Sequence, residues 1–165
     1  KMEAAPPELQ WELVGHLQSN KAKLAAGRFD RIQSVDSVKL LRRLNVAMES
    51  EGGSQRILLQ VNTGEDPAKF GVLPQDAEAL LEEGLSLPCI EVEGFMTIAP
   101  FSKDPDIARR AFARLREVGN TLAERSGTSL PEFSMGMSGD LESAIAEGST
   151  LLRLGSAFFG DRASH

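Results

Sequence analysis

Hydrophobic positions along this chain follow two alternating patterns, which divide it into strand-like and helix-like segments. Six short apolar runs read as strands, and the five segments between them repeat their apolar residues every three or four positions, as amphipathic helices do. The predicted strands are 11–16, 31–35, 56–61, 90–98, 133–137 and 151–159. The first predicted helix is 19–26, and the second is capped by Asp36 and ended by Gly52. Three more helices are predicted, and they lie between Pro74 and Gly84, between Asp104 and Gly127, and between Leu141 and Gly148.

Strict alternation of strands and helices indicates an α/β fold with parallel strands and right-handed helical crossovers. A complete (β/α)8 barrel of the TIM type has eight strands and about 250 residues. This chain has 165 residues. We therefore expect a single domain over 1–165 that is either a barrel with about six of its eight βα units or an open α/β sheet.

Composition narrows the range of functions. The chain is 41% hydrophobic and 25% charged, as is usual for a globular domain with a core, and its net charge of −6 disfavours nucleic acid and anionic membranes as partners. The single cysteine, Cys89, excludes an intrachain disulfide and suits a reducing cytoplasm. We find no apolar stretch long enough to cross a membrane, no zinc-ligand spacing, and neither a dinucleotide-binding nor a Walker glycine motif.

Residues 132–162 carry the clearest candidate site. Ser138-Gly139-Asp140 ends a strand, and Ser138 is expected to cap the next helix and leave backbone N–H groups free for an anion. Gly155-Ser156 offers a second place where backbone can approach a ligand closely. Side by side, the two turns would form a phosphate-binding cup, although an ordinary helix cap and an ordinary strand kink explain the same residues.

Arg153 favours the functional interpretation. It lies within the otherwise apolar run 151–159, where a cation needs a partner or a cavity. Other polar residues at predicted strand ends, where βα loops carry chemistry in α/β folds, are His16, Asn62 and Thr97. The pair Phe158-Phe159 is expected in the core.

Several motifs resemble the pyridoxal phosphate homeostasis protein family, which is related to the N-terminal barrel of alanine racemase. They are GHLQSNK at 15–21, EGFMTI at 93–98, SMGMSGDLESAI at 134–145 and LRLGSAFFG at 152–160. The resemblance implies a (β/α)8 barrel that binds pyridoxal 5′-phosphate (PLP) and acts in vitamin B6 homeostasis as a carrier or regulator, with no established reaction. It also implies a monomeric complete protein, and apo-PLP enzymes as recipients of the cofactor.

The resemblance assigns roles to individual residues. Ser138, Gly155 and Ser156 would hold the phosphate, and Arg153 would face the pyridine nitrogen and keep it unprotonated. The residues expected to line the cofactor pocket are His16, Asn20, Met96 and Met137. Lys69, in the loop that begins at Asn62, would approach the cofactor phenol.

One departure concerns the lysine that forms the Schiff base with PLP. In the family it lies on the first strand, and we expect it upstream of Lys1, because no predicted strand interior here contains a lysine. A PLP-dependent amino-acid racemase is the alternative function, although the chain has no tyrosine to serve as a catalytic acid or base. A cofactor-free barrel that binds a sugar phosphate is the third.

Overall fold

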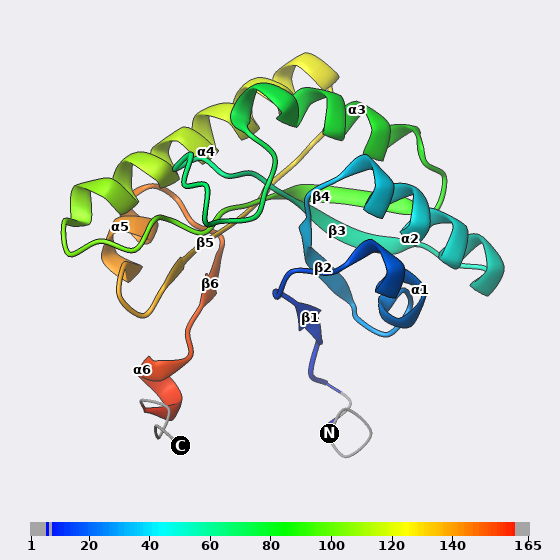
Figure 1. The fold of residues 1–165 in the computed structure, drawn as a ribbon, viewed down its shortest axis with the longest axis horizontal. Coiled ribbons are helices and arrows are strands. Elements are labelled where there is room, and N and C mark those ends of the chain that lie inside the picture. The colour runs from blue at the N-terminus through cyan, green and yellow to red at the C-terminus, as the bar shows by residue number, and fades with distance from the viewer. Residues whose placement is uncertain (1–5, 7, 161–165) are drawn as a thin grey trace.

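A computed structural model describes Pro6 and residues 8–160; Lys1 lies outside this range. Strands and helices alternate along the chain (Figure 1). The strands are β1 (Glu12–Leu13), β2 (Arg31–Val35), β3 (Gln55–Gln60), β4 (Ile90–Met96), β5 (Glu132–Met137) and β6 (Leu151–Arg153). The α-helices are α1 (Ala22–Ala25), α2 (Val38–Glu51), α3 (Ala77–Ser86), α4 (Pro105–Ser126), α5 (Leu141–Ala146) and α6 (Ser156–Phe159), with 3-10 turns η2 (Ser19–Lys21) and η3 (Pro74–Asp76).

The six strands form one parallel sheet in the order of the sequence. The sheet is strongly curled, and helices α2, α3 and α4 arch over its convex side, while β1 and β6 form its two edges (Figure 1). The prediction of parallel strands joined by helical crossovers is confirmed. The described residues therefore form a partial barrel with six of the eight βα units of the TIM type.

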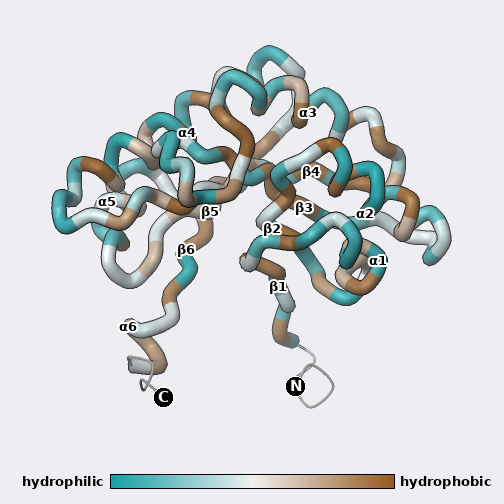
Figure 2. The backbone as a smooth tube through the Cα atoms, in the orientation of Figure 1, coloured by the Kyte–Doolittle hydropathy of each residue, from teal (hydrophilic) through white to brown (hydrophobic). Residues whose placement is uncertain are grey.

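The main hydrophobic core lies between the convex face of the sheet and the helices. The longest helix, α4, contributes Phe112 and Leu115, which are fully buried, and Phe95 reaches it from β4. Figure 2 shows hydrophobic residues along the central strands, with hydrophilic ones interspersed along α4. Burying each large side chain contributes about 1.5–3 kcal/mol, so this face holds the helices in place.

Two glycines permit contacts that no other residue would allow. A Cβ on Gly94 in β4 would lie 2.0 Å from the carbonyl oxygen of Glu132 in β5. Gly136 in β5 has φ of +96°, and a Cβ there would lie 2.4 Å from the Cβ of Ala144 in α5. The close approach of β4, β5 and α5 therefore depends on the missing side chains at these positions.

The structure corrects several details of the prediction. The strand predicted at 151–159 ends at Arg153, because Gly155 turns the chain into the short helix α6. Phe158 and Phe159 are 74% and 88% exposed on that helix, so the expectation that they lie in the core is wrong. The strand predicted at 11–16 is limited to Glu12–Leu13.

Two predicted helix caps are also wrong. The N-cap of α2 is Ser37, whose hydroxyl accepts a hydrogen bond from the Leu40 N–H, and Asp36 lies one residue earlier. Ser138 lies too far ahead of α5 to cap it, since the N-cap position belongs to Asp140. In each case the predicted N-cap is one or two residues too early, because serine and aspartate, which both favour the N-cap, lie close together in the sequence.

Candidate functional site

Polar side chains face one another across the concave side of the sheet. The Ser134 hydroxyl on β5 donates a 2.5 Å hydrogen bond to the side-chain oxygen of Gln33 on β2, although β3 and β4 separate these strands in the sheet. Both residues are buried. The curl of the sheet is therefore sufficient to bring opposite strands into contact, as in a barrel interior.

Charged residues of β1, β4 and β5 gather around Arg31, the first residue of β2. Arg31 is 5% exposed and contacts Glu12 at 2.6 Å and Glu93 at 2.8 Å, with Glu132 at 3.8 Å. Burial acts to lower the pKa of Arg31, but hydrogen bonds to Glu12 and Glu93 outweigh it and raise that pKa. Its Nε atom is buried without a partner among the described residues.

Arg153 at the end of β6 is held differently. One of its nitrogens donates to the Ser134 hydroxyl and the other to the Thr97 backbone carbonyl, both at 2.7 Å. Within the described part of the chain it forms no ion pair with a carboxylate. Removal from water lowers the pKa of Arg153 to about 10, and the negative charge of Asp140 only partly offsets this. Arg153 is therefore a cation at neutral pH whose partners here are neutral.

The two turns expected to form the phosphate cup lie in contact. The backbone N–H of Ala157, in the first turn of α6, donates a 3.2 Å hydrogen bond to the Ser138 hydroxyl. The N–H groups of Ser138, Gly139, Gly155 and Ser156 donate to no acceptor among the described residues. Neighbouring free N–H groups of this kind can bind an anion. Asp140 turns its carboxylate back onto the Met137 N–H at 2.5 Å.

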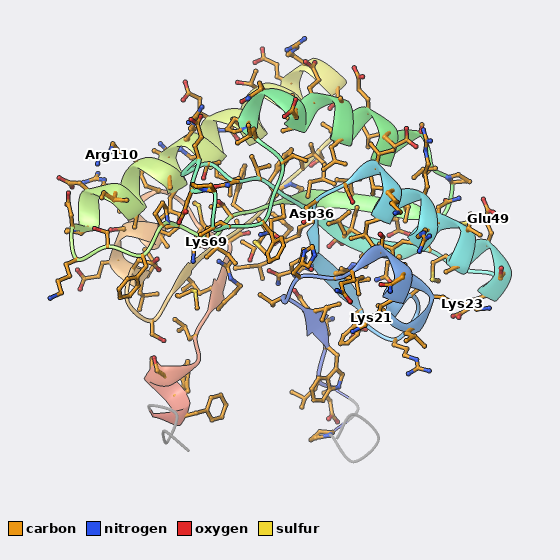
Figure 3. All side chains as sticks on the ribbon, viewed as in Figure 1. Lys21, Lys23, Asp36, Glu49, Lys69 and Arg110 are labelled. Carbon is orange, nitrogen blue, oxygen red and sulfur yellow. The ribbon has the colours of Figure 1, made fainter. Side chains whose placement is uncertain are left out.

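His16 and Asn20 line a second hollow, at the ends of β1 and β2. This pocket has a volume of about 440 Å³ and is also lined by Asp36, Lys39 and Arg43. The His16 ring stacks on Phe70 with centroids 3.7 Å apart, and its Nδ1 lies 3.3 Å from Asp36. In Figure 3, Asp36 lies toward the centre of the fold, whereas Lys23 lies on α1 at the periphery.

The loop after β3 is closed by the side chain of Asn62. Its amide nitrogen donates to the carbonyls of Asp66 and Lys69, at 2.8 and 3.4 Å, and its oxygen accepts from the Asp66 N–H at 3.2 Å. Thr63 next to it contacts the Thr97 hydroxyl at 3.0 Å. This loop is thus tied to the strand end that also holds Arg153.

The remaining predicted residues have contrasting environments. Met96 on β4 is fully buried, whereas Met137 at the end of β5 is 47% exposed. The structure therefore brings Ser138, Gly155 and Ser156 together and places Arg153 on the adjoining strand, but no hydrogen bond among the described residues joins that group to His16 or Asn20. Whether all eight residues serve one cofactor stays a prediction.

Sequence reasoning missed the buried network on the concave face, which involves Glu12, Arg31, Gln33 and Ser134. The available signal was the spacing of Arg31 and Gln33 in β2, because two polar residues two positions apart in a strand share one face. Within the described residues no group of three His, Cys, Asp or Glu side chains is placed to hold a metal ion. None of the described helices is both long and apolar enough to cross a membrane.

Comparison with known proteins gives consistent matches. The model of the alanine racemase N-terminal domain matches residues 2–163. Pyridoxal phosphate homeostasis proteins of Aquifex aeolicus and Vibrio cholerae are 38% and 37% identical to this chain over 94% and 93% of its length. The matches cover 68% and 65% of those relatives, so this chain spans about two thirds of their length.

Solved structures agree with the sequence matches. PipY of Synechococcus elongatus without PLP has a TM-score of 0.88 and 40% identity, covering 94% of this chain and 73% of PipY. The structure of PipY with PLP bound has a TM-score of 0.86 and 39% identity, covering 93% and 72%. The chain therefore belongs to the alanine racemase N-terminal domain family, among the pyridoxal phosphate homeostasis proteins.

Proposed function

We propose that this chain binds PLP reversibly and contributes to vitamin B6 homeostasis as a carrier or regulator, without catalysing a reaction. The proposal rests on the environment of Arg153, which is a partly buried cation that donates only to two neutral acceptors. Its guanidinium has further N–H groups that could donate to a ligand. The name of the relatives and the PLP-bound structure of PipY support this choice of ligand.

The residues of this chain fit the cofactor at both ends. The free N–H groups of the Ser138 and Gly155 turns suit a phosphate dianion, and the Ser138 hydroxyl adds a donor. Arg153 would donate to the pyridine nitrogen and keep it unprotonated, because a guanidinium has no lone pair to accept a proton. Bound PLP supplies an electrophilic aldehyde and an electron-withdrawing ring, and an unprotonated nitrogen weakens the ring as an electron sink.

The affinity follows from the phosphate contacts. Three or four charge-assisted hydrogen bonds worth about 1.5 kcal/mol each sum to about 4.5–6 kcal/mol, which corresponds to a dissociation constant on the order of 0.1 mM. The six described strands contain no lysine. The proposal for this chain is accordingly reversible binding of moderate affinity.

Calorimetric titration with pyridoxine 5′-phosphate tests the proposal, since this probe lacks the aldehyde and cannot react with surface lysines. We expect a dissociation constant of about 0.1 mM, weaker binding of unphosphorylated pyridoxine, and weaker binding of glycerol phosphate, which has no ring nitrogen for Arg153. Equal dissociation constants for pyridoxine 5′-phosphate and glycerol phosphate would favour a barrel that binds sugar phosphates instead.

Two further measurements separate the alternatives. After incubation with PLP and borohydride reduction, the intact mass of this polypeptide should show no stoichiometric adduct, and a stable single adduct would contradict reversible binding. The rate of amino-acid racemisation by the protein with PLP should equal the rate with free PLP alone. A rate above that background would support the racemase alternative.

A further inference from the structure

We propose that Ser134 and Gln33 are positioning residues that hold Arg153 in place and keep its charge available to a ligand. The inference rests on the function proposed for Arg153, but it concerns two buried residues that lie on other strands. Ser134 contacts both Arg153 and Gln33, at 2.7 and 2.5 Å. Gln33 in turn contacts Glu12 through its side-chain nitrogen.

The chemistry of the groups fixes the direction of every hydrogen bond in this chain of contacts. A guanidinium only donates, so the Ser134 oxygen must accept from Arg153, and the Ser134 proton is directed to Gln33. The Gln33 amide therefore presents its oxygen to Ser134 and its nitrogen to Glu12, whose carboxylate only accepts. Because Arg153 can only donate and Glu12 can only accept, the hydrogen bonds of Ser134 and Gln33 between them must all run in one direction.

This arrangement connects a cation to an anion through two neutral groups. Aligned hydrogen bonds polarise one another, so the Glu12 carboxylate at one end strengthens the hydrogen bond that Ser134 accepts from Arg153 at the other. Glu12 itself also contacts Arg31 at 2.6 Å. A direct ion pair would occupy the guanidinium face that a ligand needs, whereas Ser134 and the Thr97 carbonyl leave it free to donate further.

Removing the Ser134 hydroxyl should release one side of the Arg153 guanidinium. The negative charge of Asp140 acts on the pKa of Arg153 and would attract the guanidinium once it is released. Arg153 would then rotate more freely and donate less effectively to a ring nitrogen. Contacts to phosphate lie in the Ser138 and Gly155 turns and should be unaffected.

The variant Ser134→Ala tests the proposal, with Ser149→Ala as the matched control. Ser149 carries a half-buried hydroxyl in the loop before β6, and that hydroxyl contacts only the backbone carbonyls of residues 133, 135 and 151. The first measurement is side-chain nitrogen NMR of Arg153 in the ligand-free protein. We expect distinct signals for its two terminal nitrogens in the wild type and in Ser149→Ala, and merged signals from faster rotation in Ser134→Ala.

The second measurement is binding of pyridoxine 5′-phosphate and of inorganic phosphate. Ser134→Ala should weaken the first about tenfold and leave the second unchanged, and Gln33→Leu should act in the same direction. Unchanged Arg153 signals in Ser134→Ala would overturn the positioning role whether or not the ligand is correct. Altered signals in a protein that binds no pyridoxine 5′-phosphate would support the positioning role and overturn the proposed function.

Discussion

The Ala157 N–H and the Ser138 hydroxyl form a 3.2 Å hydrogen bond that joins the turn after β5 to the turn after β6. The two segments are 19 residues apart in the chain and belong to different βα units. This contact gives the proposed phosphate site its shape, because it fixes the free N–H groups of both turns relative to each other. The two turns that would hold the phosphate are thus in contact without a ligand.

Replacing Ser138 by alanine tests the importance of that contact. We expect Ser138→Ala to weaken binding of inorganic phosphate and of pyridoxine 5′-phosphate about tenfold each, since it removes a donor worth about 1–2 kcal/mol. Titration calorimetry measures both. Ser126→Ala, which removes an exposed hydroxyl at the end of α4, should change neither, and an unchanged phosphate affinity in Ser138→Ala would place the anion elsewhere.

Arg153 should contribute to ligand binding while lowering the free energy of unfolding. It is a desolvated cation without a carboxylate partner in the described residues, and such groups are often replaced by apolar residues without loss of stability. We expect Arg153→Met to unfold in urea with a free energy equal to or above that of the wild type, while losing preference for the pyridine ring. A loss of more than about 1 kcal/mol would mean that Arg153 is mainly structural.

Glu93 should make the protein sensitive to acid. Burial acts against its ionisation, but hydrogen bonds from Arg56 and Arg31 outweigh burial and hold the pKa of Glu93 below its ordinary value of 4.5. The unfolded chain therefore binds the proton more readily, so this contribution to stability is fully present above about pH 4.5 and is lost as pH falls through the folded pKa.

Urea unfolding of Glu93→Gln between pH 3 and 7 measures this effect. The variant should be less stable than the wild type at pH 7 by about 1.5–3 kcal/mol, the range for hydrogen bonds to charged groups. The difference should narrow on acidification. A constant difference across the range would show that the carboxylate charge is not what matters.

Gly136 should tolerate no side chain. Its φ of +96° and the 2.4 Å approach of the Ala144 Cβ make Gly136→Ala both strained and overpacked, at a cost of about 2–3 kcal/mol. Gly15→Ala is the control, because a Cβ there has no neighbour within 4 Å, and it should change unfolding by less than about 0.5 kcal/mol. Equal effects of the two substitutions in thermal or urea unfolding would contradict the packing argument.

The sequence predicted the order and type of elements well, because each long helix carries a regular apolar face. The apolar positions of α4, such as Phe112 and Leu115, recur as the helical period requires and are buried as expected. Parallel pairing followed from strict alternation alone. The end of β6 was harder to predict, because the apolar residues after Gly155 resemble a strand while lying exposed on a short helix.

The candidate site was predicted in part. Turn residue types identified Ser138 and Gly155-Ser156 as neighbours, and their contact follows from adjacent parallel strands. The partners of Arg153 could not be predicted, since Ser134 and Thr97 lie 19 and 56 residues away and resemble ordinary strand residues. The link from Ser134 to Gln33 spans 101 residues and depends on how tightly the sheet curls, which no local pattern specifies.

The three hydrogen bonds made by Asn62 have a consequence for the speed of recognition. The Asn62 side-chain amide closes the loop that carries Lys69 and Phe70, and these bonds restrain the loop without a ligand. Encounter with a small molecule then requires no slow ordering step, and association is limited by diffusion and orientation. For the cofactor binding proposed above, the rate of exchange would accordingly be governed by the rate at which the cofactor leaves.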